Sequence, residues 1–160
     1  MSAPKAAATA RYQALLQLLR TADTLWNASR VFFGRWDLGP SQFNVLNLLS
    51  DQPNGLSQVE LGRLLIMHRS NVTGLVDRLE KRGLVARRED ATDRRAYRVV
   101  LTPAGRRLLE EILPEFYRLA EDVWDNVPAP RAKELAGDLA RLAETAEKLT
   151  PEANSISRVP

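Results

Sequence analysis

SQVELGRLLIMHRSNVTGLVDRLEKRGLVARREDATDRRAYRVVLTPAG, residues 57–105, is the stretch that decides the fold of this chain. Its first residues have the S-x-x-E form of a capping box, so a short helix is predicted to begin at Ser57 and end near residue 66. A second helix is predicted over residues 68–82. Gly83 follows it, where a helix commonly ends on a left-handed cap residue.

Two strands rich in Val, Leu and Tyr follow at about residues 84–89 and 96–101, joined by the polar loop DATDRR. Two short helices and then a basic hairpin form the order of a winged helix-turn-helix. We therefore expect a mostly α fold with a small β-hairpin wing, of the α+β class, flanked by long dimerisation helices. Residues 39–102 would form the winged helix-turn-helix domain.

Outward from this segment, the sequence predicts further helices. Gly39-Pro40 marks a stop and a restart before a helix over residues 41–50. A long helix over residues 10–36 repeats apolar residues every three or four positions. Thr102-Pro103 begins another helix, and VPAP separates it from a last one. These outer helices, residues 10–38 and 103–150, would form a helical dimerisation region, although a single monomeric bundle is the alternative.

The composition limits the possible functions. No apolar run approaches the roughly 20 residues of a membrane helix, and the chain has no signal-peptide pattern. With no cysteine and one histidine, the chain offers no plausible zinc site, and we expect neither metal nor cofactor. Residues 1–9 and 151–160 are expected to be disordered tails. A cytoplasmic location is expected.

Charge is concentrated in the middle of the chain. The segment from Ser57 to Arg107 carries a net charge of +6, whereas the rest of the chain carries −3. A basic centre suggests a partner with phosphates, and the alternative is an ordinary solvated charged surface.

The helix over residues 68–82, the reading helix, has an apolar face at Val72, Leu75, Val76 and Leu79. Its other face is polar, and short polar groups with an arginine are the groups that read base edges in the major groove. A solvent-facing helix is the alternative. With the cap and the strands included, the candidate DNA contacts outside the wing tip are Ser57, His68, Arg69, Ser70, Asn71, Thr73, Arg78 and Arg87.

The tip of the hairpin is Asp93-Arg94-Arg95. An arginine at the end of a narrow ribbon can enter the minor groove, where the negative potential is concentrated. Asp93 is expected to hold one arginine in place.

Residues 57–105 resemble the winged helix-turn-helix of MarR-type transcriptional regulators, through RSNVTGLVDRLEKRGLV, the D-x-R of the wing and LTPAG. PSQFNVLNLL, residues 40–49, is similar to the preceding helix of that family. The resemblance implies a homodimer that binds double-stranded DNA at an inverted-repeat operator, represses transcription and is released by a small aromatic or phenolic ligand. His68 departs from the serine or threonine more common there, and a capping, phosphate-contacting or ligand-lining role stays open.

The same resemblance implies a ligand pocket between the outer helices and the DNA-reading part. Trp26 and Arg30 are one helical turn apart, and an arginine beside an aromatic wall suits a planar carboxylate. Aromatic residues at this spacing are also typical of a core, and Arg30 would then pair with an acid. The candidate ligand residues are Trp26, Arg30, Phe33, Trp36, Phe43 and Met67.

No nucleophile with a base, phosphate loop or H-E-x-x-H motif is present, so an enzyme is not expected. The remaining alternative is a winged-helix protein-interaction module without sequence-specific DNA binding.

Overall fold

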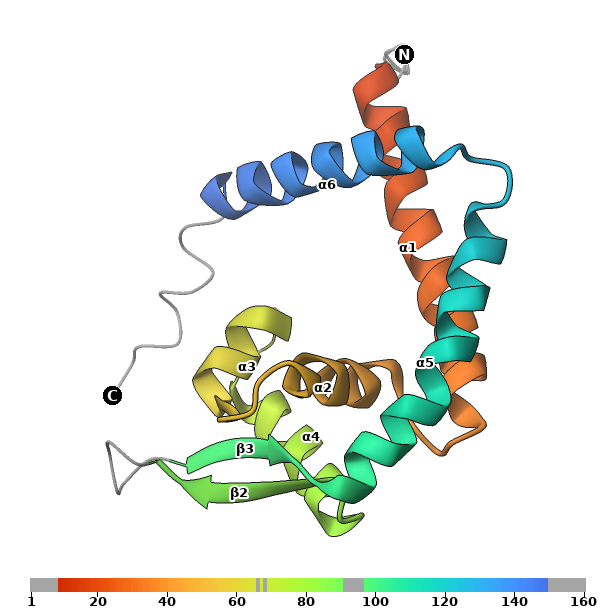
Figure 1. Ribbon diagram of the computed structural model, residues 1–160. Helices are drawn as coiled ribbons and strands as arrows, with labels where there is room; N and C mark the ends of the chain where they lie inside the picture. Colours follow the sequence, from red (N-terminus) through yellow and green to blue (C-terminus); the bar gives the residue numbers. More distant parts are fainter. Residues whose placement is uncertain (1–8, 66, 68, 91–96, 150–160) are drawn as a thin grey trace, which may run out of the picture. The chain divides into compact units, whose positions relative to one another are not determined.

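The computed structural model describes residues 9–149, except for 66, 68 and 91–96 (Figure 1). The predicted tails, apart from Thr9, therefore lie outside the described residues. The predicted class, mostly helical with a small sheet, is confirmed. The elements are α1 (Ala10–Gly34), α2 (Pro40–Ser50), β1 (Leu56–Ser57), α3 (Gln58–Leu65), α4 (Arg69–Lys81), β2 (Val85–Glu89), β3 (Tyr97–Leu101), α5 (Pro103–Trp124) and α6 (Ala129–Leu149).

The sheet is antiparallel with strand order β1-β3-β2. In the hairpin Val85 pairs with Leu101 and Glu89 with Tyr97, and on the other side of β3 Leu56 pairs with Val99. The sequence predicted the two hairpin strands but not β1. Two residues are too few to show an alternating pattern, and β1 exists because a distant strand pairs with it.

The reading helix α4 ends as the sequence predicts. Gly83 has a φ of 69°, in the left-handed region where a side chain is disfavoured. The Leu84 amide donates to the Leu79 carbonyl and the Gly83 amide to the Glu80 carbonyl, at 3.0 and 2.8 Å. This double closure is a Schellman motif, and it turns the chain from α4 directly into β2.

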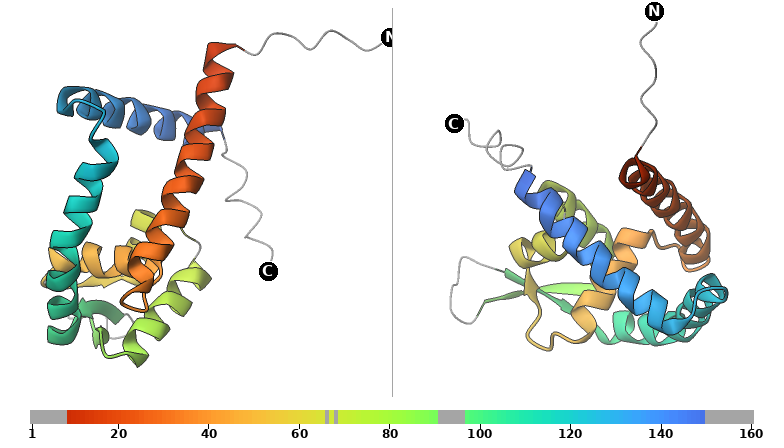
Figure 2. Two further views of the ribbon diagram at one scale, coloured as in Figure 1. Left: turned by 90° about the vertical axis from the view of Figure 1, so that its right-hand side faces the viewer. Right: turned by 90° about the horizontal axis from the view of Figure 1, so that it is seen from above.

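The core of the winged helix-turn-helix lies between α2, α3, α4 and the sheet, which pack on one another in both views of Figure 2. The predicted inward face of α4 is confirmed, because all four of its residues are buried. So are Phe43, Leu46 and Leu49 of α2, as their spacing predicted. Burying such side chains contributes about 1.5–3 kcal/mol each, which fixes the outward direction of the polar face of α4.

The chain divides into two compact units, Met1–Glu111 and Ile112–Pro160, with the boundary inside α5. Within the second unit, α6 has no buried residue. Large apolar side chains are also exposed on α1 in the first unit. The grouping of residues 10–38 with 103–150 as a dimerisation region stays a prediction. No helix in the described part of the chain is long and apolar enough to span a membrane.

Candidate DNA interface and adjoining cavity

The first turns of α4 carry short polar groups on an exposed surface. Ser70 and Asn71 are exposed, while Val72 beside them is fully buried, so the helix is fixed with these groups outward. Thr73 is partly buried, and its hydroxyl donates to Gln58 Oε1 at 2.8 Å, which joins α4 to α3. Ser70 and Asn71 thus lie on the exposed surface at the helix start, while Thr73 braces the two helices.

Several predicted contacts are not placed by the structure. His68, Asp93, Arg94 and Arg95 lie outside the described residues, so the wing tip and the residue before α4 stay predictions. Arg69 is the first residue of α4.

The arginines of α4 and β2 have different surroundings. Arg78 and Arg88 are exposed. Arg87 is half-buried and pairs with two carboxylates of α4, Asp77 at 2.5 Å and Glu80. Burial lowers the pKa of the Arg87 guanidinium, but hydrogen bonds to Asp77 and Glu80 outweigh it and raise the pKa overall. Arg78 and Arg88 are therefore more accessible to a phosphate than Arg87 is.

Arg98 makes a second set of hydrogen bonds and ion pairs, at the base of the wing. Arg98 of β3 donates to the carbonyls of Asn54 and Gly55, at 2.9 and 2.7 Å, and pairs with Asp90 and Glu60. The hairpin is therefore tied to the turn before β1 and to α3. From the sequence, Arg98 is one of the strand arginines that could reach a phosphate, and no local pattern predicts this bracing role.

Ser57, a predicted contact, is engaged in the capping box that its motif predicts. Its amide donates to Glu60 Oε2 at 2.7 Å, and the Glu60 amide donates to Ser57 Oγ at 3.2 Å. The pKa of Glu60 is held below its ordinary value by the hydrogen bonds from the backbone and side chain of Ser57. Burial acts in the opposite direction, and the charge of Arg98 lowers the pKa further.

Replacing Glu60 with glutamine is expected to reduce the acid sensitivity of the fold. Because the folded pKa lies below the unfolded value, the carboxylate stabilises the wild type above about pH 4.5 and that contribution is lost as the pH falls through the folded pKa. Urea unfolding at neutral and acid pH should therefore give a smaller difference between wild type and variant at acid pH. An equal difference at both pH values would contradict this account.

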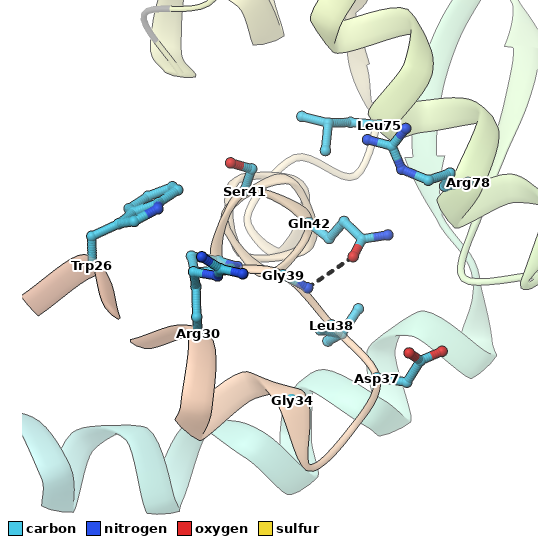
Figure 3. Close-up of a pocket in the computed structure, with 11 residues that line it drawn as sticks. Trp26, Arg30, Gly34, Asp37, Leu38, Gly39, Ser41, Gln42, Leu75 and Arg78 are labelled. Carbon is cyan, nitrogen blue, oxygen red and sulfur yellow. Dashed lines mark hydrogen bonds between the residues drawn. The ribbon is translucent and has the colours of Figure 1, made fainter. Parts of the chain in front are cut away.

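A cavity of about 530 Å³ adjoins the reading helix. Trp26 and Arg30 line it from α1, Leu75 and Arg78 from α4, and the first turn of α2 lies between them (Figure 3). No carboxylate pairs with Arg30 within the described part of the chain, so its charge is available there. Two predicted ligand residues are thus brought to one cavity.

The other four predicted ligand residues lie elsewhere. Phe33 and Phe43 stack in the core with ring centroids 4.2 Å apart, and the structure favours the core alternative for both. Trp36 donates its indole N–H to Glu111 Oε1 at 2.8 Å. Met67 lines a separate cavity of about 330 Å³ together with Ser70, Asn71 and Arg78.

Sequence reasoning missed a link between the end of α4 and the connection that follows α1. Arg82 donates to the carbonyls of Asp37 and Trp36, at 2.5 and 3.0 Å. Asp37 and Trp36 are 45 and 46 positions from Arg82 in the sequence, and no local pattern predicts such a contact. The same connection, Asp37–Gly39, lines the larger cavity.

A capped helix-turn-helix, an exposed polar start of its second helix and a basic hairpin together define a winged helix-turn-helix DNA-binding regulator. The family model described as MarR family matches residues 36–96. The chain belongs to the MarR family.

Three known proteins support this assignment. The transcriptional repressor MprA of Escherichia coli (strain K12) is 35% identical over 80 residues, which are 50% of this chain and 46% of MprA. A probable transcriptional regulator from Pseudomonas aeruginosa, known from its crystal structure, is 33% identical. That match covers 78% of this chain and 93% of the other, with a TM-score of 0.68.

A third similar structure contains a ligand. It is CouR from Rhodococcus jostii RHA1 bound to p-coumaroyl-CoA, 27% identical with a TM-score of 0.74, and the match covers 79% of this chain and 89% of CouR. The relatives of this chain are transcription regulators and not enzymes.

Proposed function

We propose that this protein is a sequence-specific repressor that binds an inverted-repeat operator as a homodimer and acts in the cytoplasm. The exposed polar start of α4, held outward by the buried apolar face of the same helix, carries the proposal. Asn71 can pair with adenine and Ser70 with a base edge or a phosphate, while Arg78 can reach a phosphate or guanine. The repressor role is supported by the similarity to MprA.

Uncovered apolar side chains on the outer helices support the homodimer. They include Leu15, Leu19 and Val31 on α1, Tyr117 and Val123 on α5, and Leu135, Leu142 and Leu149 on α6. Surfaces of this kind mark protein interfaces, and a two-fold dimer matches the symmetry of an inverted repeat. Sedimentation equilibrium should give twice the mass of one chain, and a stable monomer would contradict the proposal.

Salt-dependent binding tests DNA recognition. Duplexes selected from a random pool should yield an inverted repeat with half-sites about one helical turn apart. Because phosphate contacts release counterions, affinity should fall steeply, by about 10³-fold or more between 50 and 200 mM salt if six or more phosphates are contacted. Equal affinity for the inverted repeat and a scrambled duplex would instead favour the alternative, a protein-interaction module.

Replacing Asn71 with alanine is expected to relax base preference at one position of each half-site. A bidentate contact to adenine is worth about 1–3 kcal/mol of discrimination, and that discrimination would be lost. Binding of operators changed at each position in turn measures it. Asn47→Ala is the matched control, because Asn47 is also an exposed helical asparagine but lies on α2. An unchanged base preference in the Asn71 variant would remove this residue from the reading surface.

We also propose that the larger cavity accepts a small aromatic acid as effector. The indole of Trp26 offers an apolar wall and Arg30 a guanidinium for the carboxylate. Since Leu75 and Arg78 of α4 line the same cavity, a bound ligand would contact the reading helix. The p-coumaroyl-CoA in CouR supports an aromatic group, though on a larger molecule.

Titration calorimetry with salicylate and p-coumarate tests the cavity. Arg30→Ala should weaken binding of either acid, whereas Arg20→Ala, which removes the same charge from an exposed site on α1 outside the cavity, should leave it unchanged. No heat with either acid, or equal loss in both variants, would count against the cavity as the effector site.

A further inference from the structure

Arg87 is held by α4 through three hydrogen bonds. Its backbone amide donates to Glu80 Oε1 at 2.9 Å, its Nη1 donates to the other oxygen of the same carboxylate, and its Nη2 donates to Asp77 Oδ1 at 2.5 Å. A single strand residue thus uses both its main chain and its side chain on one helix. The Arg87–Asp77–Glu80 cluster is called the clamp below.

The clamp is poorly suited to a phosphate contact. Asp77 and Glu80 lie three residues apart, on one side of α4, and together they place two negative charges against one positive charge. A phosphate that approached Arg87 would meet a group of net charge −1, and it would have to displace a carboxylate. Paired carboxylates also keep the Arg87 guanidinium directed toward α4.

The neighbouring residue provides a contrast on the same strand. Successive side chains of a strand point to opposite faces, so Arg88 is directed away from the face where Arg87 meets α4. Arg88 is exposed, and no ion pair holds it among the described residues. Two adjacent arginines of equal charge therefore differ in whether they can reach a phosphate.

We propose that Arg87 is a positioning residue for DNA recognition, which fixes the wing relative to the reading helix and does not itself contact DNA. The inference rests on the proposed sequence-specific binding. The clamp joins the middle of β2 to the last two turns of α4, so it couples the described strands of the hairpin to the reading helix. An operator is recognised only when helix and wing reach the DNA together, whereas non-specific binding depends mainly on charge.

Neutralising one acid of the clamp should change operator affinity in opposite directions for the two possible roles of Arg87, positioning the wing or contacting a phosphate. Glu80→Gln makes the protein more positive by one charge and keeps the side-chain shape. If Arg87 positions the wing, operator affinity should fall about three- to tenfold while affinity for a scrambled duplex stays equal or rises. If Arg87 were a phosphate contact, freeing it from Glu80 should raise affinity for both duplexes.

Arg87→Ala, with Arg88→Ala as matched control, completes the test by filter binding over a range of salt. Arg87→Ala should lower the preference for operator over scrambled duplex and leave the salt slope on the scrambled duplex unchanged. Arg88→Ala removes the same charge without touching the clamp, so the preference should stay at the wild-type value. Because both changes disable one clamp, the double variant Glu80→Gln with Arg87→Ala should lose little more preference than Arg87→Ala alone.

Three results would overturn the inference. One is a salt slope reduced by about one unit in Arg87→Ala with equal loss on both duplexes, which marks a phosphate contact. Another is an unchanged operator preference in both clamp variants. If Arg87→Ala does not fold, Glu80→Gln and Arg87→Lys keep the comparison decisive. A wild type without operator preference would instead refute the proposed function, and the inference would fall with it.

Discussion

Replacing Phe43 with alanine is expected to lower the free energy of unfolding by about 3–5 kcal/mol. The side chain is 1% exposed, and its ring stacks on Phe33 with centroids 4.2 Å apart and planes 21° apart. Removal leaves a void between α1 and α2, which the rigid neighbouring helices cannot fill. Urea unfolding followed by far-UV circular dichroism measures the loss.

The control for Phe43 is Val59→Ala, which truncates a 45% exposed side chain on α3 and is expected to change stability by no more than about 0.5 kcal/mol. The experiment also separates two roles that the sequence left open for Phe43. Unchanged stability together with lost binding of an aromatic acid would mean that Phe43 lines the effector site and is not part of the core.

Replacing Gly105 with alanine is expected to destabilise the protein by about 3 kcal/mol or more, at the upper end of the cost of overpacking. A Cβ atom at this position would lie 2.1 Å from the Leu84 carbonyl oxygen and 2.8 Å from Leu101 Cδ1. That oxygen is held in place, because the amide and hydroxyl of Thr102 both donate to it, at 3.1 and 3.0 Å. The start of α5 and the end of the hairpin would have to separate.

Gly137→Ala provides the comparison for Gly105. Gly137 lies inside α6, where a Cβ atom would meet nothing within 4 Å. Alanine is the better helix former, so this variant should gain up to about 1 kcal/mol. Thermal unfolding measures the stability of both variants. A Gly105 variant as stable as wild type would contradict the close contact with Leu84.

The local features of the fold follow from sequence because each depends on residues close together in the chain. The S-x-x-E motif predicts the cap of α3, Gly83 predicts the end of α4, and the three- and four-residue spacing predicts which face of α4 is buried. In each case the deciding interaction spans no more than a few positions. Short-range rules of helix capping and amphipathicity are therefore enough.

The contacts that organise the site, in contrast, join residues that lie far apart in the sequence. β1 forms because Leu56 meets Val99, and Arg98 reaches the carbonyls of Asn54 and Gly55 across more than forty residues. The charge of Arg87 was visible in the sequence, but its partners on α4 were not. A basic residue on a predicted wing indicates DNA binding in general, and only the tertiary fold tells which arginine faces a carboxylate.

The placement of the three tryptophans has a practical consequence for following this protein in solution. Trp26 lies on α1 beside the larger cavity, Trp36 follows the end of α1, and Trp124 ends α5. The reading helix and all three strands contain none. Tryptophan emission, excited selectively over that of Tyr97 on β3, therefore reports on the outer helices, so a change in the tryptophan spectrum on adding operator would record a response transmitted from the DNA-binding surface, without any label.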